Sequence, residues 1–203
     1  MNVRPLNSRQ CQSAFTLIEL LITMTVLGVL MAIALPNLQS FVIGNRLTSN
    51  VNSFVGLVNY ARSEAIARNQ SVIICPRSNT AIACASDPLW GLYELQVFVD
   101  CTGNGDRNSG ATTNCPTGDT LLKTMPALDT TGNEFVLIRG ALTPAVGTIR
   151  FGAAGLSQTA HSFAINAKGD AAYELQYGRT ICISRPGRVR VTPPLTSGSC
   201  SAF

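Results

Sequence analysis

The stretch that decides the fold is FTLIELLITMTVLGVLMAIAL, residues 15–35, in which Glu19 is the single charged side chain. At about 1.5 Å per residue, a helix of this length just crosses the apolar core of a bilayer. A cleavable signal peptide has a shorter apolar region that ends at a small-residue cut site. Here the helical pattern continues beyond Pro36. The sequence therefore predicts a membrane-spanning helix, with Arg4 and Arg9 on the cytoplasmic side by the positive-inside rule.

The second half of this helix has a different pattern. Apolar residues recur at steps of three and four and form one stripe, namely Leu47, Val51, Phe54, Val55, Val58, Ala61 and Ala65. One helix is expected from about Phe15 to about Asn69, uniformly apolar in its first half and amphipathic in its second. Pro36 removes a backbone donor inside the helix and should kink it or open it locally.

Beyond residue 70 the pattern changes to short β-rich runs separated by turn residues. The expected strands are SVIIC (71–75), LYELQVFVD (92–100), EFVLIRG (134–140), GTIRFGA (147–153), HSFAIN (161–166), RTICIS (179–184) and RVRV (188–191). The turn-rich segments 113–120 and 193–203 are interpreted as loop or tail. The fold class is α+β, a long helix packed on a β-rich domain.

Composition excludes some classes of protein. Apolar residues make up 46% of the chain and charged ones 13%, which argues against disorder. Of the 15 cationic side chains only Lys123 and Lys168 are lysine, and planar guanidinium groups suit phosphate better than ammonium groups do. The segment RPGRVRVTPPL (185–195) holds three of these arginines and no carboxylate. The imbalance points to an anionic partner.

Cysteines predict disulfides rather than a metal centre. Cys11 stands apart, and the other six lie beyond residue 70; proximity favours the pairs Cys75 with Cys84, Cys101 with Cys115, and Cys182 with Cys200. His161 is the only histidine and no cysteines have CxxC spacing, so neither a metal nor a cofactor is expected. No nucleophile stands in an elbow-like context, which argues against an enzyme.

Two further motifs have plainer interpretations than a binding site. DCTGNGDRN (100–108) is slightly like a calcium loop, but Thr102 replaces an expected Asp or Asn and no Glu stands at the twelfth position. A hairpin turn at 104–105 is favoured. Trp90 is expected to pack beside the sheet rather than to stack on bases.

The start of the chain resembles a known processing signal. AFTLIELL behind a short basic leader is similar to the class III signal of type IV pilins and pseudopilins. The resemblance implies that prepilin peptidase cuts between Ala14 and Phe15, that the new Phe15 amine is methylated, and that Glu19 pairs with this amine on a neighbouring subunit during assembly. One departure is Ala14, because the family usually has Gly before the cut.

The middle of the chain resembles one branch of that family. NYARSEAIARNQSV (59–72), followed by LYELQVFVD, is similar to the GspH/FimT group, and most like its FimT-like minor pilins. The resemblance implies a cleaved leader (1–14), a transmembrane and assembly segment (15–43) and a periplasmic pilin-like domain (44–203). It also implies a single-pass inner-membrane protein that joins other pilins in a type IV pilus.

Some FimT-like proteins are implicated in DNA uptake during natural transformation through a C-terminal GRxR motif. Here the motif is formed by Gly187, Arg188, Val189 and Arg190. Strand alternation puts the two arginines on one face, about 6.6 Å apart at roughly 3.3 Å per residue. The resemblance implies DNA binding by Arg188 and Arg190, with Gly187 as part of the motif. Arg185 and Arg179 are expected to assist, because no acidic side chain follows Glu174. Phosphate contacts do not read bases, so the binding is expected to be sequence-independent. The alternative is a structural minor pilin or GspH-like secretion pseudopilin, in which the arginines protect an edge strand.

Overall fold

The computed structural model describes residues 15–77, 83–85, 90–107, 110–111, 113, 115–128, 135–139, 147–167, 176–194 and 200. The chain forms two compact units, Met1–Val42 and Ile43–Phe203. The predicted leader, including Ala14 on its side of the expected cut, lies outside the described residues.

Helix α1 (Leu17–Arg68) is the only α-helix longer than one turn in the described part of the chain. Its bounds agree with the expected helix to within two residues. The helix is not interrupted at Pro36, so the predicted local opening does not occur. Proline removes a single N–H donor, and the hydrogen bonds of the adjacent turns are sufficient to keep the helical conformation.

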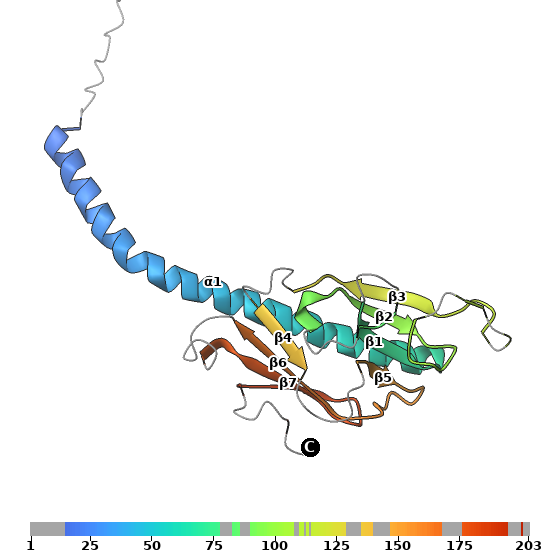
Figure 1. Ribbon diagram of the computed structural model, residues 1–203. Coiled ribbons are helices and arrows are strands. Elements are labelled where there is room, and N and C mark those ends of the chain that lie inside the picture. Colours follow the sequence, from blue (N-terminus) through green and yellow to red (C-terminus); the bar gives the residue numbers. More distant parts are fainter. Residues whose placement is uncertain are drawn as a thin grey trace, which may run out of the picture. The chain divides into compact units, whose positions relative to one another are not determined.

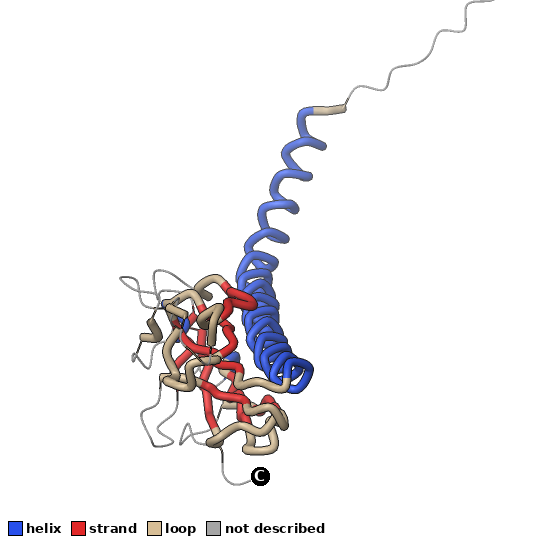
Figure 2. The backbone as a smooth tube through the Cα atoms, turned by 90° about the vertical axis from the view of Figure 1, so that its right-hand side faces the viewer, coloured by secondary structure: helices blue, strands red, loops and turns tan. Residues whose placement is uncertain are grey.

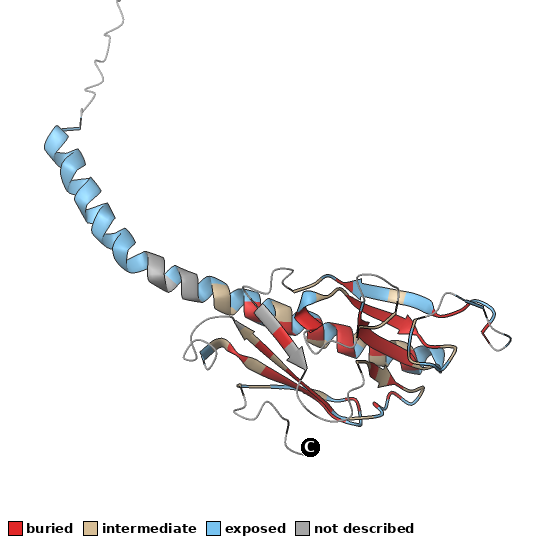
Figure 3. Cartoon of the chain, viewed as in Figure 1, coloured by how far each residue is buried: buried red, intermediate tan, exposed pale blue. Residues whose placement is uncertain are grey.

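The first unit consists of the apolar part of α1. From Leu17 to Ala34 none of the helix is buried, and Figure 3 shows this stretch exposed along its length. Its length and composition are sufficient for crossing a membrane. A helix that is apolar on every side needs an apolar environment on every side.

The other end of α1 has a defined stop signal. Asn69 adopts a positive φ of 53°. Its N–H bonds to the Ile66 carbonyl and the Gln70 N–H bonds to the Ala65 carbonyl. This is the Schellman arrangement, in which a left-handed residue satisfies carbonyls that the helix end leaves open. The chain therefore leaves the helix in a fixed direction and enters the first strand after Ser71.

The second unit contains two antiparallel four-stranded sheets. The strands are β1 (Val72–Pro76), β2 (Leu95–Val99), β3 (Thr120–Met125), β4 (Phe135–Arg139), β5 (Ile149–Phe151), β6 (His161–Ala167), β7 (Arg179–Ile183) and β8 (Val189–Thr192). The first sheet has the order β3-β2-β1-β5 and the second the order β4-β6-β7-β8 (Figure 1). Figure 2 shows the strands gathered on one side of the second half of α1. The α+β fold is confirmed.

One core joins α1 to both sheets. The predicted stripe supplies Leu47, Val51, Phe54, Val58, Ala61 and Ala65, all buried, whereas Val55 is only half-buried and Leu57 is an additional buried member. Phe54 packs edge-on against Phe163 of β6, with ring centroids 5.0 Å apart. Trp90, in the short 3₁₀ helix η1 (Trp90–Leu92), is fully buried and lies 4.9 Å from the same ring. Trp90 is thus a core residue, as expected.

Two features of the β region test the expectations directly. The three disulfides join Cys75 to Cys84, Cys101 to Cys115, and Cys182 to Cys200, the pairs that proximity favoured. Strand β3 was not predicted, because its sequence TLLKTM lacks alternation and five of its six residues are exposed or half-buried. It is an edge strand of the first sheet.

Candidate functional site

The GRxR sequence lies in the hairpin formed by β7, a connecting loop and β8, here called the arginine hairpin (residues 179–192). Two backbone hydrogen bonds close the loop. The Gly187 N–H donates to the Ser184 carbonyl at 2.8 Å, and the Ser184 N–H donates to the Arg188 carbonyl at 2.9 Å. The Ser184 hydroxyl also accepts a bond from the Arg188 N–H. Gly187 has a φ of 75°, a conformation that glycine adopts without strain. Pro186 and Gly187 thus lie in a tight turn between β7 and β8.

The loop is held from outside the hairpin as well. The Ser157 N–H donates to the Arg185 carbonyl at 2.8 Å. Gly187 is buried against the Gly155 carbonyl and the Arg62 side chain of α1. The backbone that carries Arg185 and Arg188 is therefore fixed by two segments that are distant in sequence, the 152–157 loop and α1.

The arginine side chains of the loop and of β8 face outward. Arg185, Arg188 and Arg190 are exposed, while Val189 between them packs against the core. Among the described residues, no hydrogen bond or ion pair is formed by the guanidinium of Arg185 or Arg188. Two exposed cations on a fixed turn, with a third on the adjoining strand, can hold an anion that spans several ångströms.

Arg179 does not belong to this group. It begins β7, four residues before Ile183 at the loop end, or about 13 Å along an extended strand. Its Nη1 donates to the carbonyls of Gln176, Tyr177 and Gly178, the last at 2.7 Å. The side chain thus stabilises the turn that precedes β7. Sequence proximity grouped Arg179 with the motif, but the geometry of the strand separates them.

Arg62 was missed by the sequence analysis. It lies 93 positions before Gly155, to whose carbonyl its Nε donates a bond of 3.1 Å. On the helical pattern it belongs to the polar side of α1, and no local signal distinguishes it from Arg46 or Arg68. Only the packing of the two loops against α1 brings it to the hairpin.

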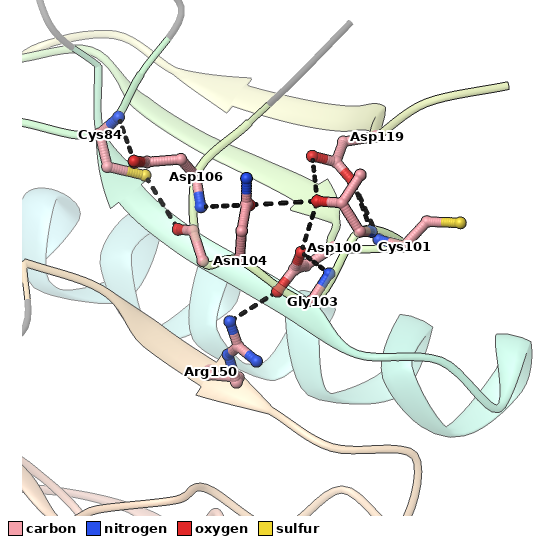
Figure 4. Close-up of polar contacts among 10 residues, drawn as sticks. Cys84, Asp100, Cys101, Gly103, Asn104, Asp106, Asp119 and Arg150 are labelled. Carbon is pink, nitrogen blue, oxygen red and sulfur yellow. Dashed lines mark hydrogen bonds and ion pairs between the residues drawn. The ribbon is translucent and has the colours of Figure 1, made fainter. Parts of the chain in front are cut away.

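The described part of the 100–108 loop, residues 100–107, is organised by contacts within the protein (Figure 4). Both oxygens of Asp100 are engaged: Oδ1 accepts from the Gly103 N–H at 2.8 Å and Oδ2 pairs with Arg150 Nη2 at 2.6 Å. Asp119 Oδ1 accepts from the N–H groups of Cys101 and Thr102. These carboxylates serve as acceptors for backbone and arginine donors. Within the described residues no group of His, Cys, Asp and Glu could hold a metal ion.

The start of α1 carries the residues expected to act in processing and assembly. Phe15 is exposed just before the helix, and Glu19 is exposed in its first turn. The Glu19 N–H donates to the Thr16 hydroxyl at 3.3 Å, so Thr16 is the N-cap and Glu19 the third helical residue of a Thr-x-x-Glu capping sequence. A carboxylate also interacts favourably with the helix N-terminus. Glu19 can therefore stabilise the helix start of its own chain.

His161 lies inside the domain, at the start of a strand. It is buried at the start of β6, and its Nε2 lies 3.1 Å from the Thr159 hydroxyl. The sequence interpretation of His161 as an ordinary strand residue agrees with this position.

Comparison with known proteins gives two family matches. Residues 50–187 match the model of the type II transport protein GspH, and residues 9–35 match the prokaryotic N-terminal methylation motif. The first match ends at Gly187, so it does not extend to Arg188 or Arg190. No curated protein sequence matches the chain.

Three solved structures are similar in fold. Two crystal forms of the type IV minor pilin FimU of Pseudomonas aeruginosa have TM-scores of 0.49 and 0.47, with 21% and 23% identity. They cover 73% and 72% of this chain and 90% and 92% of theirs. The minor pseudopilin EpsH of the Vibrio cholerae type 2 secretion system has a TM-score of 0.43 and 17% identity, covering 73% of this chain and 98% of its own.

The two family matches agree with the architecture described above. The methylation motif falls on the start of the exposed apolar helix, and the longer match spans the amphipathic half of α1 and most of both sheets. The chain therefore belongs to the GspH family, as a minor pilin or pseudopilin of a type IV pilus or a type II secretion system.

Proposed function

We propose that this protein is a minor type IV pilin that binds DNA through the arginine hairpin, so that retraction of the pilus can draw DNA inward during natural transformation. Arg188 and Arg190 make the principal phosphate contacts, and Arg185 assists from the same turn. Gly187 contributes its conformation. Arg179 is left out of the contact set because its guanidinium bonds to carbonyls at the far end of β7.

The observation that carries the proposal is the exposure of these arginines on a fixed backbone without a neutralising group in the sequence around them. No Asp or Glu follows Glu174, and none lies in residues 152–157, whose backbone contacts the loop. Like charges held close together on a protein surface repel one another and favour an anionic partner. Guanidinium groups bind phosphate oxygens with two parallel hydrogen bonds.

The expected mode of binding follows from the chemistry of the contacts. Phosphate contacts position a protein on nucleic acid without reading bases, so the binding is sequence-independent. If three phosphates are engaged, log affinity falls with log salt at a slope of about −3 on duplex DNA. A site of this size binds weakly on its own, and effective capture requires several copies along a fibre.

The decisive experiment is a salt titration of DNA binding by the domain Ile43–Phe203, which contains the whole core. Wild type is compared with Arg188→Gln/Arg190→Gln on single- and double-stranded DNA of several sequences. We expect salt-sensitive binding in wild type and a slope reduced by about 2 in the variant, one unit for each lost phosphate contact. A matched control is Arg68→Gln, which removes a cation elsewhere on the domain. Circular dichroism verifies that all three proteins are folded.

The same variants separate this proposal from a purely structural role. Arg190 lies on β8, an edge strand of the second sheet, where arginines also discourage the addition of strands from other molecules. DNA binding predicts that Arg188→Gln/Arg190→Gln abolishes transformation while pili still assemble. Normal transformation together with defective pili or secretion would contradict the proposal and favour a structural subunit.

The N-terminal features extend the proposal to maturation and location. We infer cleavage by prepilin peptidase between Ala14 and Phe15, methylation of the Phe15 amine, pairing of that amine with Glu19 of a neighbouring subunit, and a C-terminal domain in the periplasm. The methylation-motif match and the exposed apolar helix support this. Mass spectrometry of the N-terminal peptide from purified pili checks it, since an intact leader or an unmethylated Phe15 would be visible directly.

A further inference from the structure

The side chain of Arg62 reaches from α1 to the base of the arginine hairpin. Its Nε donates a hydrogen bond of 3.1 Å to the Gly155 carbonyl. The side chain is half-buried. Since a hydrogen bond from an arginine is charge-assisted, it is stronger than one between neutral groups. The contact ties the loop of residues 152–157 to the helix.

Gly187 packs directly against both partners of this hydrogen bond, the Arg62 side chain and the Gly155 carbonyl. A Cβ at this position would lie 2.6 Å from the Gly155 carbonyl oxygen, 2.8 Å from Arg62 Nε and 3.0 Å from Arg62 Cδ. No side chain fits in this space. Two features of position 187 therefore require glycine. One is the positive φ, and the other is the close approach of the backbone to Arg62 and Gly155.

We propose that Arg62 is a positioning residue for the DNA-binding hairpin. It holds the Gly155 carbonyl and packs on Gly187, and the same 152–157 loop bonds to the Arg185 carbonyl through the Ser157 N–H. Arg185 and Arg188 consequently project from a backbone that is ordered before DNA arrives. A site ordered in advance loses less entropy on binding. This inference rests on the proposed function and adds a residue that lies outside the GRxR sequence.

Three substitutions separate positioning from direct phosphate contact. Arg62→Gln places an amide nitrogen at the same distance along the side chain as Nε, so it retains the donor and removes the charge. Arg62→Met retains the length and removes both donor and charge. Arg62→Lys retains the charge and moves the donor one bond further out. Each is made in the domain Ile43–Phe203 and in the full chain for transformation.

Positioning by the Nε–H group predicts a specific order of affinities. Arg62→Gln should bind a duplex oligonucleotide within about twofold of wild type with an unchanged salt slope, since the lost charge is screened in part at physiological salt. Arg62→Met should bind roughly three- to tenfold more weakly, the range expected for one lost hydrogen bond. Arg62→Lys should resemble Arg62→Met.

Two outcomes overturn the inference. Arg62 contacts phosphate directly if Arg62→Gln and Arg62→Met bind DNA equally weakly, with a salt slope reduced by about one, while Arg62→Lys binds with the affinity of wild type. If all three variants bind like wild type, Arg62 has no role at the site.

A second measurement keeps the inference testable without DNA. Amide hydrogen exchange of Ser157, Gly187 and Arg188, referenced to β6, reports on the order of the loop. We expect faster exchange in Arg62→Met than in Arg62→Gln. Failure of wild type to bind any DNA would reject the proposed function alone, while the exchange rates would still decide whether Arg62 orders the hairpin. Equal rates in all variants would reject the positioning role.

Discussion

Arginine occupies two contrasting settings in this domain, the 100–108 loop and the arginine hairpin. At the loop, Arg150 of β5 pairs with Asp100 at 2.6 Å, and the Asp100 side chain is fully buried while that of Arg150 is 21% exposed. In the hairpin, Arg185 and Arg188 are exposed, and the sequence around them contains no carboxylate.

The difference teaches which arginines the fold itself requires. A buried carboxylate is costly unless a cation and hydrogen-bond donors compensate it, so Asp100 requires Arg150. An exposed guanidinium is solvated by water and requires no partner. Arg185 and Arg188 can therefore be replaced without loss of fold, and a requirement for them would come from function.

The largest effect on stability is expected from loss of the ion pair between Arg150 and Asp100. Arg150→Met leaves Asp100 buried and without its cation, which should lower the free energy of unfolding by about 3 kcal/mol. Urea denaturation measures the change. Adding Asp100→Asn should recover part of the loss, because the amide oxygen can still accept from the Gly103 N–H. A single-variant loss below about 1 kcal/mol would show that the pair is not required for the fold.

The next effect tests the backbone of the hairpin. Gly187→Ala should destabilise the domain by more than Gly103→Ala, since both positions have a positive φ, 75° and 79°, but only Gly187 has atoms within 4 Å of the added methyl group. We expect about 1 kcal/mol for the conformational strain at Gly103 and at least twice that at Gly187. Thermal unfolding of the two variants gives the difference. Equal losses would argue against the tight contact with Arg62 and Gly155.

A smaller stability effect is expected from the arginines of the hairpin. Arg188→Gln/Arg190→Gln should change the free energy of unfolding by no more than about 0.5 kcal/mol, the range typical of exposed positions. DNA affinity should nevertheless fall, which is the signature of a residue retained for a partner. A destabilisation comparable to that of Arg150→Met would show that the fold itself requires these arginines.

The smallest effect is expected for an ion pair on the surface of α1. Arg68 Nε lies 2.6 Å from Glu64 Oε2, and the Arg68 side chain is 44% exposed. Glu64→Gln should cost about 0.3 kcal/mol, as for other exposed pairs four residues apart on a helix. Chemical denaturation in low and high salt measures it, because only a screened interaction loses its contribution when salt is added. A salt-independent loss would point to a packing role instead.

Local patterns in the sequence predicted most of the fold. The spacing of Leu47, Val51 and Phe54 defined the buried face of α1, and seven of the strands coincide with β-rich runs. Strand β3 was missed because an exposed edge strand does not need alternating apolar residues. The helix continues through Pro36 without the local opening that was one of the two expected effects.

The candidate site was predicted only where it is continuous in sequence. Gly187, Arg188 and Arg190 are neighbours, and the turn that presents them follows from local preferences. Arg62 could not be predicted, because its contact with Gly155 spans 93 positions and depends on how both sheets pack against α1. Arg179 was grouped with the motif because few residues separate it from the turn. In the structure these residues form the extended strand β7, so Arg179 lies at the end of the strand far from the turn.

The order of strands has a consequence for how the domain folds. The chain completes β1, β2 and β3 of one sheet, forms β4 of the other, returns to add β5 to the first, and only then forms β6, β7 and β8. Neither sheet can be finished before part of the other exists. Such interleaving raises the sequence separation of native contacts, which slows folding, and it leaves no half of the domain able to persist alone. The domain should therefore fold and unfold as a single cooperative unit, so that damage to either sheet is felt by the whole domain.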